Sequence, residues 1–171
     1  MNRFVKLSAV VVLCGGMAMS ASAQTGGDAP SRDRLTPEKL VDILIKHGHQ
    51  ANLKTFKDGV KNVDAAVTID GLRYELEFAF DPKTLTFHVY CVLGYASQLA
   101  PHQFEALLRK NWDLPMPMHF TIRPDGKLML EDPNFSTMTT NETGVLNIIN
   151  LLTKSARNTQ SVWAPAGAVS K

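Results

Sequence analysis

The sequence predicts an α+β domain in which one mainly antiparallel sheet of five strands packs, in two layers, against helices. Five segments alternate apolar and polar residues with the period of a strand, and three segments carry apolar residues at helical spacing. Short turns join neighbouring strands at Asp70-Gly71, Asp81-Pro82 and Pro124-Asp125-Gly126, which requires antiparallel pairing. Because such a sheet must bury its apolar face, the order helix, three strands, helix, two strands, helix predicts a two-layer domain.

Residues 1–23 have the three parts of a secretory signal peptide. Arg3 and Lys6 charge the start, an apolar run extends from Leu7 to Met19, and Ala21-Ser22-Ala23 forms a cleavage site. The run of about 13 residues is shorter than the roughly 20 that span a bilayer, which favours cleavage over an uncleaved anchor. A lipid anchor at Cys14 is the weaker alternative, because a small residue is expected where Leu13 stands. We therefore expect a bacterial protein exported to the periplasm, or secreted, with no stable membrane span.

Loss of the signal peptide changes both the charge and the cysteine count. Arg3 and Lys6 leave with it and no acid does, so 18 basic and 16 acidic residues become 16 of each. A neutral chain without a basic cluster is a poor ligand for nucleic acid. Cys14 is also lost, and Cys91 alone cannot form an internal disulfide. We expect Cys91 to be a buried, inert thiol, because it lies within an apolar alternation.

The first half of the chain is predicted as a leader, a helix and three strands. Residues 24–34 are polar and predict a flexible leader. A helix begins at Pro37 with Thr36 as its cap and ends at Gly48. Residues 49–61 indicate an irregular approach with a turn. The three strands follow over residues 63–69, 72–80 and 85–93.

The second half is predicted as a helix, a hairpin, a helix and a tail. A helix begins near Pro101, and Pro115 and Pro117 exclude helix beyond it. A hairpin over residues 118–122 and 127–131 leads through a loop at Pro133 to a capping box at residues 139–142. We expect one domain over residues 35–163 and a flexible tail over 164–171. The apolar faces are Phe104, Leu107, Leu108 and Trp112 in the second helix, and Val145, Ile148, Ile149 and Leu152 in the last.

No catalytic, metal or cofactor signature stands out, so we predict a protein that is not an enzyme. The five histidines lie near no paired cysteines and no H-E-x-x-H pattern, and a metal role for His47 and His49 is the weak alternative. Glu75 and Glu77 share one face of a strand and could do acid–base work with His88 or His119. A solvated face with cross-strand ion pairs is the favoured explanation, because no second carboxylate cluster lies near them in the sequence.

The open sheet face is the predicted binding surface, because a two-layer domain covers only the other face with helices. Tyr90 and Val92 are its apolar members, and tyrosine is a favoured anchor at interfaces. We predict partner contact at Tyr90, Val92, His88, Glu75 and Glu77. Four methionines around the second hairpin are the alternative surface, with at least two expected in the core: Met116, Met118, Met129 and Met138. The predicted open face comprises Arg73, Glu75, Glu77, His88, Tyr90, Val92, His119 and Thr121.

Three features of the second half carry a family resemblance: Leu107-Leu108-Arg109-Lys110-Asn111 at a helix end, the hairpin from Phe120 to Leu130 around Pro124-Asp125-Gly126, and the late Trp163. With these features the chain from Leu35 to Trp163 resembles YbjN-like domains and the CesT/Tir-type chaperones of type III secretion. The resemblance implies a non-catalytic, chaperone-like module that holds a partner polypeptide, often as a homodimer, without a cofactor. Those chaperones are cytoplasmic and typically acidic, whereas this chain is predicted to be exported and neutral, which favours a periplasmic relative of the YbjN-like branch.

Overall fold

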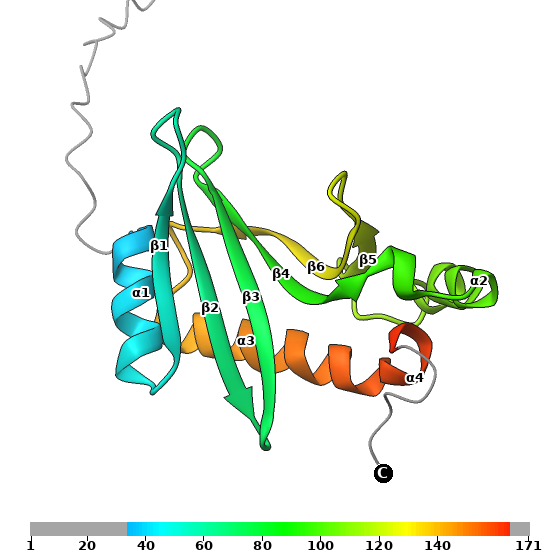
Figure 1. Ribbon diagram of the computed structural model, residues 1–171. Coiled ribbons are helices and arrows are strands. Elements are labelled where there is room, and N and C mark those ends of the chain that lie inside the picture. Colours follow the sequence, from blue (N-terminus) through cyan, green and yellow to red (C-terminus); the bar gives the residue numbers. More distant parts are fainter. Residues whose placement is uncertain (1–33, 165–171) are drawn as a thin grey trace, which may run out of the picture. The chain divides into compact units, whose positions relative to one another are not determined.

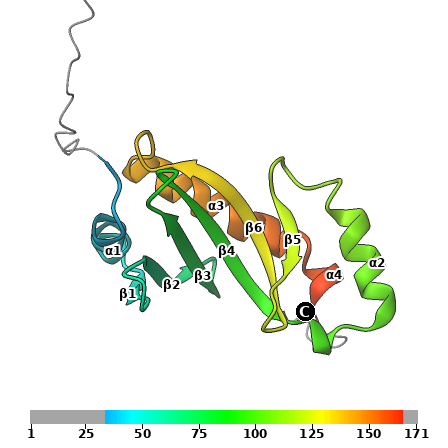
Figure 2. The same cartoon turned by 90° about the horizontal axis from the view of Figure 1, so that it is seen from above.

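The computed structural model describes residues 34–164, in which six strands form one antiparallel sheet (Figure 1). The strand order is β1-β2-β3-β4-β6-β5. α1 packs against β1 and β2, and α3 runs across the strands and contacts β4 and β6 (Figures 1 and 2). In chain order the elements are α1 (Pro37–Lys46), β1 (Gln50–Thr55), β2 (Lys61–Ile69), β3 (Leu72–Asp81), β4 (Thr86–Tyr95), the 3-10 turn η1 (Ala96–Gln98), α2 (Pro101–Lys110), β5 (His119–Ile122), β6 (Lys127–Ser136), α3 (Glu142–Asn158) and α4 (Gln160–Trp163).

The α+β fold class and the antiparallel pairing are confirmed, but the strand count of five is wrong. The additional strand is β1, which lies in the segment expected to be irregular and pairs with β2 from Gln50↔Ala66 to Thr55↔Lys61. β1 is an edge strand, and every residue in it except Ala51 is exposed. Backbone pairing therefore holds it in place, and its side chains carry little of the hydrophobic pattern that identifies a strand.

β6 is also longer than predicted, because it continues through Pro133 to Ser136. β5 pairs with β6 only from Leu128 to Glu131. Beyond Glu131 no described strand lies on that side of β6, so proline's missing N–H breaks no ladder there. The pairing of β6 with β4 shifts register between Phe87 and Val89, which marks a local bulge.

The core lies between the sheet and the helices α1 and α3. Leu40 and Leu44 of α1 are fully buried, as are Val145 and Leu152 of α3. Burying one such side chain contributes about 1.5–3 kcal/mol. Cys91 points into this core, as predicted, and its burial raises the pKa of the thiol to about 12. The aromatic centre is Phe87, whose ring lies 6.4 Å from that of Phe78, 5.3 Å from Phe80 and 5.4 Å from Phe135.

α2 and α4 are joined by one buried side chain. Gln103 donates to the carbonyls of Val162 at 3.1 Å and Ala164 at 3.0 Å, and its Oε1 accepts from the Ala100 N–H at 2.9 Å. Ala164 is buried, so ordered packing extends one residue past the predicted domain end at Trp163. The predicted signal peptide, residues 24–33 of the leader and residues 165–171 of the tail lie outside the described residues. Of the helices in residues 34–164, none has the length and apolarity to cross a membrane.

Candidate functional site

The predicted open face exists, because its residues alternate along the strands with buried core residues. Cross-strand pairing brings Glu77 beside Tyr90, Tyr90 beside Glu131, and Glu131 beside His119. The eight predicted members are all exposed or half-buried: Arg73, Glu75, Glu77, His88, Tyr90, Val92, His119 and Thr121.

Glu131 is the polar centre of this face. Its Oε1 lies 3.1 Å from Nδ1 of His88, and its Oε2 lies 3.4 Å from Nε2 of His119. Burial and this carboxylate together raise the pKa of Tyr90 to about 12. The rings of Tyr90 and His88 are stacked, with centroids 6.3 Å apart and planes 10° apart. Tyr90 is therefore held by its neighbours on the open face, and Glu131, which the sequence did not single out, organises them.

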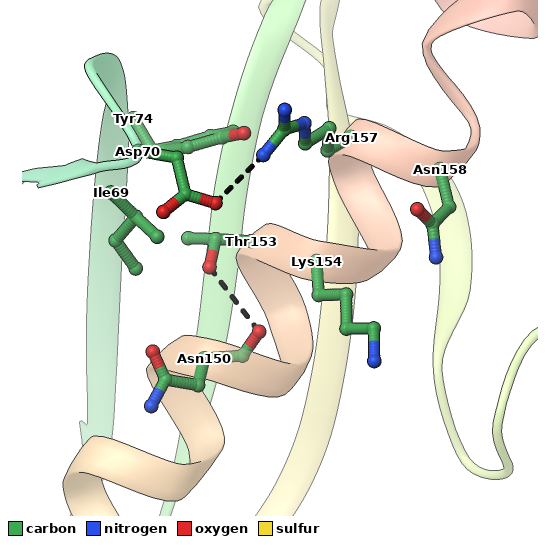
Figure 3. Close-up of a pocket in the computed structure, with 8 residues that line it drawn as sticks. All are labelled: Ile69, Asp70, Tyr74, Asn150, Thr153, Lys154, Arg157 and Asn158. Carbon is green, nitrogen blue, oxygen red and sulfur yellow. Dashed lines mark hydrogen bonds and ion pairs between the residues drawn. The ribbon is translucent and has the colours of Figure 1, made fainter.

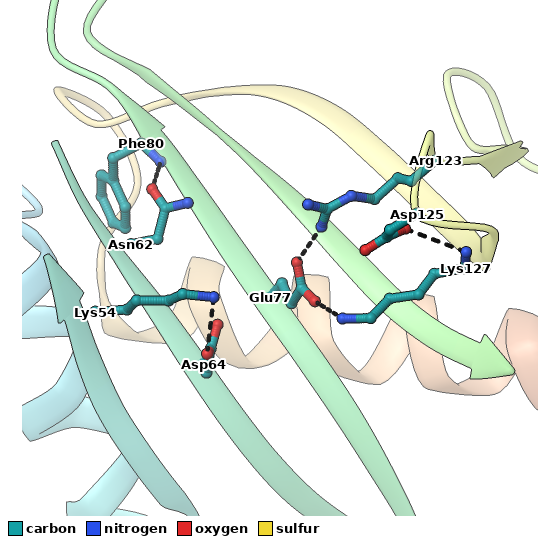
Figure 4. A network of polar contacts seen from close by, with 8 residues as sticks. All are labelled: Lys54, Asn62, Asp64, Glu77, Phe80, Arg123, Asp125 and Lys127. Atoms are coloured by element: carbon teal, nitrogen blue, oxygen red, sulfur yellow. Dashed lines mark hydrogen bonds and ion pairs between the residues drawn. The ribbon is translucent and has the colours of Figure 1, made fainter. Parts of the chain in front are cut away.

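Glu77 forms a second centre, shown in Figure 4. Its carboxylate accepts from Arg123 Nη1 at 2.5 Å and from Lys127 Nζ at 3.1 Å. The hydrogen bond to Glu77 is the main cause that raises the pKa of Lys127. Arg123 belongs to the turn between β5 and β6, and Lys127 begins β6. These two ion pairs tie the β5–β6 hairpin to β3, across the intervening strand β4.

A hollow of about 400 Å³ lies on the open face beside this hairpin. Arg123 and Pro124 form part of its wall, and Tyr90 and Glu131 contribute from β4 and β6. On the β1 side, Lys54 Nζ lies 5.3 Å from the centroid of the Phe56 ring. The remaining lining residues are Asn62, Asp64, Glu77, Ala79, Thr121 and Ile122. Glu77 and Glu131 are both occupied by donors, so the hollow offers contact groups and no free acid–base pair.

The residues of the enzyme alternative do not converge. Glu75 is exposed and pairs with Arg73 at 2.8 Å. Of the four side chains that this alternative requires, only Glu77 lines the hollow, and His88 and His119 contact Glu131.

The His47 and His49 pair is likewise not assembled as a metal site. His47 Nε2 lies 2.7 Å from Glu142, which also accepts from Lys46. Within residues 34–164 no group of three His, Cys, Asp or Glu side chains is placed to hold a metal ion.

Four exposed apolar side chains, which we call the apolar end, lie in α2, in the segment that follows it and in β5: Leu108, Trp112, Met116 and Ile122. Trp112 and Met116 are 91% exposed, Leu108 is 68% exposed and Ile122 is 46% exposed. Leu108 and Ile122 also line an apolar groove of about 140 Å³ between α2 and β5, whose other lining residues are Phe104, Leu107, Asn111, Phe120 and Leu128.

The apolar end corrects one expectation of the sequence. Leu108 and Trp112 were expected on the buried face of the second helix, but that face is narrower: Gln103 and Leu107 are buried, and α2 ends at Lys110, before Trp112. The division of the methionines agrees with the prediction, because Met118 and Met129 are buried while Met116 and Met138 are exposed.

Comparisons with known proteins bear on the fold. No model of a protein family matches the sequence, and no curated protein matches it. A chain of the ExsC–ExsE complex is 14% identical, with 77% of this chain and 98% of that chain covered, at a TM-score of 0.55. The Yersinia pestis type III secretion chaperone SycH, solved with a stable fragment of YscM2, is 19% identical, with coverage of 71% and 97% and a TM-score of 0.45. The heterodimeric ExoU–SpcU complex from the type III secretion system of Pseudomonas aeruginosa gives 15% identity, coverage of 72% and 96%, and a TM-score of 0.47.

The likeness to a chain of the ExsC–ExsE complex extends over almost all of that chain, and its TM-score supports a shared arrangement of helices and strands. At 14% identity it transfers no residue roles. This finding agrees with the resemblance noted in the second half of the sequence. The chain therefore has the same fold as that chain of the ExsC–ExsE complex, as expected from the CesT-like fold that the sequence resembles.

Proposed function

We propose that this chain is an exported, non-catalytic module that binds another polypeptide in a chaperone-like manner. The apolar end carries the proposal, because a large apolar side chain contributes about 1.5–3 kcal/mol when water is removed from it. Trp112 and Met116 are 91% exposed and gain none of this within the described domain. Leu108 and Ile122 adjoin an apolar groove, and exposed apolar surface of this kind marks interaction sites. Export is supported by the charged start, apolar run and Ala21-Ser22-Ala23 site of residues 1–23.

The fold supports the same proposal. The chain shares its fold with chaperones that bind partner proteins, and the structure with a TM-score of 0.55 is itself a complex of two proteins. Fold likeness alone does not assign a function. Here the fold likeness agrees with two observations: the apolar end is exposed, and on the open sheet face Glu77 and Glu131 are held in ion pairs within the domain.

We assign the apolar end to a second copy of the chain. Helix α2 and the turn after it carry both signs of charge, with Arg109 2.6 Å from Glu105 and Lys110 3.1 Å from Asp113. A two-fold interface places the same patch on both subunits, so a patch with balanced charges is complementary to itself. A homodimer would therefore bury the apolar residues without opposing like charges.

We assign the client polypeptide to the open sheet face, where Tyr90, Val92, His88, Glu75 and Glu77 remain the predicted contact residues. The hollow beside them has the volume of a ligand pocket and is bounded by Phe56, Ile122 and Pro124. An extended segment that crosses the strands would meet apolar and hydrogen-bonding groups in alternation.

The test places a photocrosslinking residue at Thr121, in the hollow, of the full chain expressed with its leader. A crosslinker at Leu151, which is exposed on α3, serves as the matched control. We expect envelope polypeptides to crosslink to the residue at Thr121 and not to the residue at Leu151. We also expect the mass of the purified protein to show cleavage after Ala23, so that the chain starts at Gln24.

The double variant Tyr90→Ser, Val92→Lys should fold and should lose those crosslinks several-fold, because both side chains lie on the open face. Equal crosslinking from both positions, or a folded double variant with unchanged crosslinks, would remove the open face as the client site. An unfolded variant would show that the two side chains stabilise the domain. The comparison of crosslinks from Thr121 and Leu151 would then be the test of the open face as the client site.

A further inference from the structure

A third concave site lies on the helix-covered side of the sheet, apart from the hollow and the groove described above (Figure 3). It is a pocket of about 360 Å³ between the β2–β3 turn and the last turns of α3. Ile69 and Tyr74 line it from the strands, and Thr153, Lys154 and Arg157 line it from the helix. Its volume is large enough for one side chain and the backbone beside it.

The pocket combines an apolar floor with hydrogen-bond donors. The hydroxyl of Thr153 donates to the carbonyl of Ile149 at 2.8 Å, so this group is already occupied within the helix. The ring of Tyr74 is buried, and its hydroxyl end points toward the guanidinium of Arg157 in Figure 3. No described residue forms a hydrogen bond with that hydroxyl. Burial raises the pKa of Tyr74 above its ordinary value, so the group is a neutral donor at physiological pH.

The charges of the pocket favour an anion. Arg157 donates from Nη1 to the carboxylate of Asp70 at 2.8 Å, which leaves its other N–H groups unused by described residues. Lys154 forms no ion pair with any residue in 34–164. The pocket therefore holds two cations and one carboxylate. Cations near the end of a helix also stabilise its negative pole, but that effect does not account for the unpaired tyrosine hydroxyl beside them.

Asp70 shows that Arg157 can bind a carboxylate here. It occupies the first position of a two-residue turn, with φ of 51°, followed by Gly71 with φ of 77°. This turn brings a carboxylate of the chain itself to Arg157, at the edge of the pocket. A carboxylate on a short aliphatic stem would meet the Tyr74 hydroxyl and the remaining N–H groups of Arg157, while its stem covered Ile69 and the Thr153 methyl.

We propose that this pocket binds the carboxylate of an acidic side chain presented by the partner polypeptide. The inference rests on the proposed function, because the acidic side chain belongs to the bound client polypeptide. It requires that the client carry an Asp or Glu near the segment that binds this domain. A free dicarboxylic acid offers the same chemistry, so the experiment separates the two sources.

The experiment titrates the ¹⁵N-labelled mature protein with a capped Gly-Glu-Gly peptide, its Gly-Gln-Gly counterpart and glutarate, and follows amide shifts around Asn150 and Tyr74. We expect the Glu peptide to bind in the millimolar range and the Gln peptide not to bind. Tyr74→Phe should weaken binding about three- to tenfold, the effect of losing one hydrogen bond to a charged group. Lys154→Gln, which removes only a nearby positive charge, should weaken it less.

Asp70→Asn should instead strengthen binding about two- to fivefold, because it frees Arg157 and removes a competing negative charge. The resulting Asn-Gly turn suits two consecutive positive φ angles, so this variant keeps the hairpin. Lys57→Gln, an exposed lysine of the β1–β2 turn, is the control and should change nothing.

Three results would overturn the inference: equal shifts with the Glu and Gln peptides, Asp70→Asn binding no tighter than wild type, or glutarate binding where the capped peptide does not. The last would assign the pocket to a free acid. None of these probes involves dimerisation or the open sheet face, so failure here leaves the proposed function to its own test.

Discussion

At the scale of single residues, Asp132 is the group least in keeping with its surroundings. It is only 3% exposed, and its Oδ1 has no hydrogen-bond partner among the described residues. Burial raises the pKa of this carboxyl to about 6, and the nearby His119 opposes that shift only in part. The folded state therefore holds a proton that the unfolded chain releases near pH 4.

The sign of the resulting pH dependence follows from this difference. Between about pH 4 and pH 6 the native state binds more protons than the unfolded state, so Asp132 lowers the free energy of unfolding as pH rises through that window. We expect Asp132→Asn to be more stable than wild type at pH 7, by an amount on the order of 2 kcal/mol. Urea denaturation at pH 4, 5, 6 and 7 would measure it.

The difference between Asp132→Asn and wild type should grow from pH 4 to pH 6 and then stay constant. Asp113→Asn, at an exposed site after α2, is the control and should show no such growth. A difference independent of pH would mean that the native state does not hold the Asp132 proton.

The sequence predicted which residues face the open side of the sheet and that Cys91 faces inward, because strand alternation alone determines both. It could not predict that Glu131 joins His88 and His119. That contact depends on the register between β4 and β6, which are separated in the chain by α2 and β5. Asp132 was equally hidden, since its segment was expected to be a loop.

At the scale of elements, the helices α1 to α3 and the strands β2 to β4 follow from local pattern, whereas the short helix α4 was not expected from the sequence. The misassigned strand segments lie where a strand has no neighbour on one side. β1 lacks an apolar stripe, and β6 contains a proline that only an unpaired edge tolerates. Packing between elements was also beyond the sequence, because the polar Gln103 joins α2 to α4.

We expect Gln103→Ala to lower the free energy of unfolding by about 1–3 kcal/mol, because buried carbonyls of Val162 and Ala164 lose their donor. Urea denaturation followed by Trp163 fluorescence would measure the loss. Gln160→Ala, on α4 itself, is the control and should have little effect. If Gln103→Ala matches wild type, the end of the chain does not depend on this contact.

At the scale of the whole molecule, the fold class was within reach of the sequence. The apolar end was not, because Leu108 and Trp112 have the spacing of a helix's buried face. Only the placement of α2, with Leu107 inward and Leu108 outward, shows which of these side chains are exposed.

The dimer proposal predicts a mass of two chains for the mature protein at micromolar concentrations in analytical ultracentrifugation. Trp112→Ser with Met116→Ser should shift it to the monomer while leaving its fold unchanged, because large anchors dominate the energy of such interfaces. Leu151→Ser removes an exposed apolar side chain elsewhere and should leave the dimer intact. A monomeric wild type, or a double variant that still dimerises, would contradict the assignment.

Ile122 is shared by both surfaces: it lines the hollow on the open face and also the groove at the apolar end. The turn that follows it is fastened to β3 through Arg123 and Glu77. A second subunit bound at the groove would therefore contact Ile122 and could shift one wall of the proposed client site. Assembly and cargo capture would then be linked equilibria, in which each changes the other's affinity by the same factor. Loading with cargo would accordingly set the concentration at which the two copies separate.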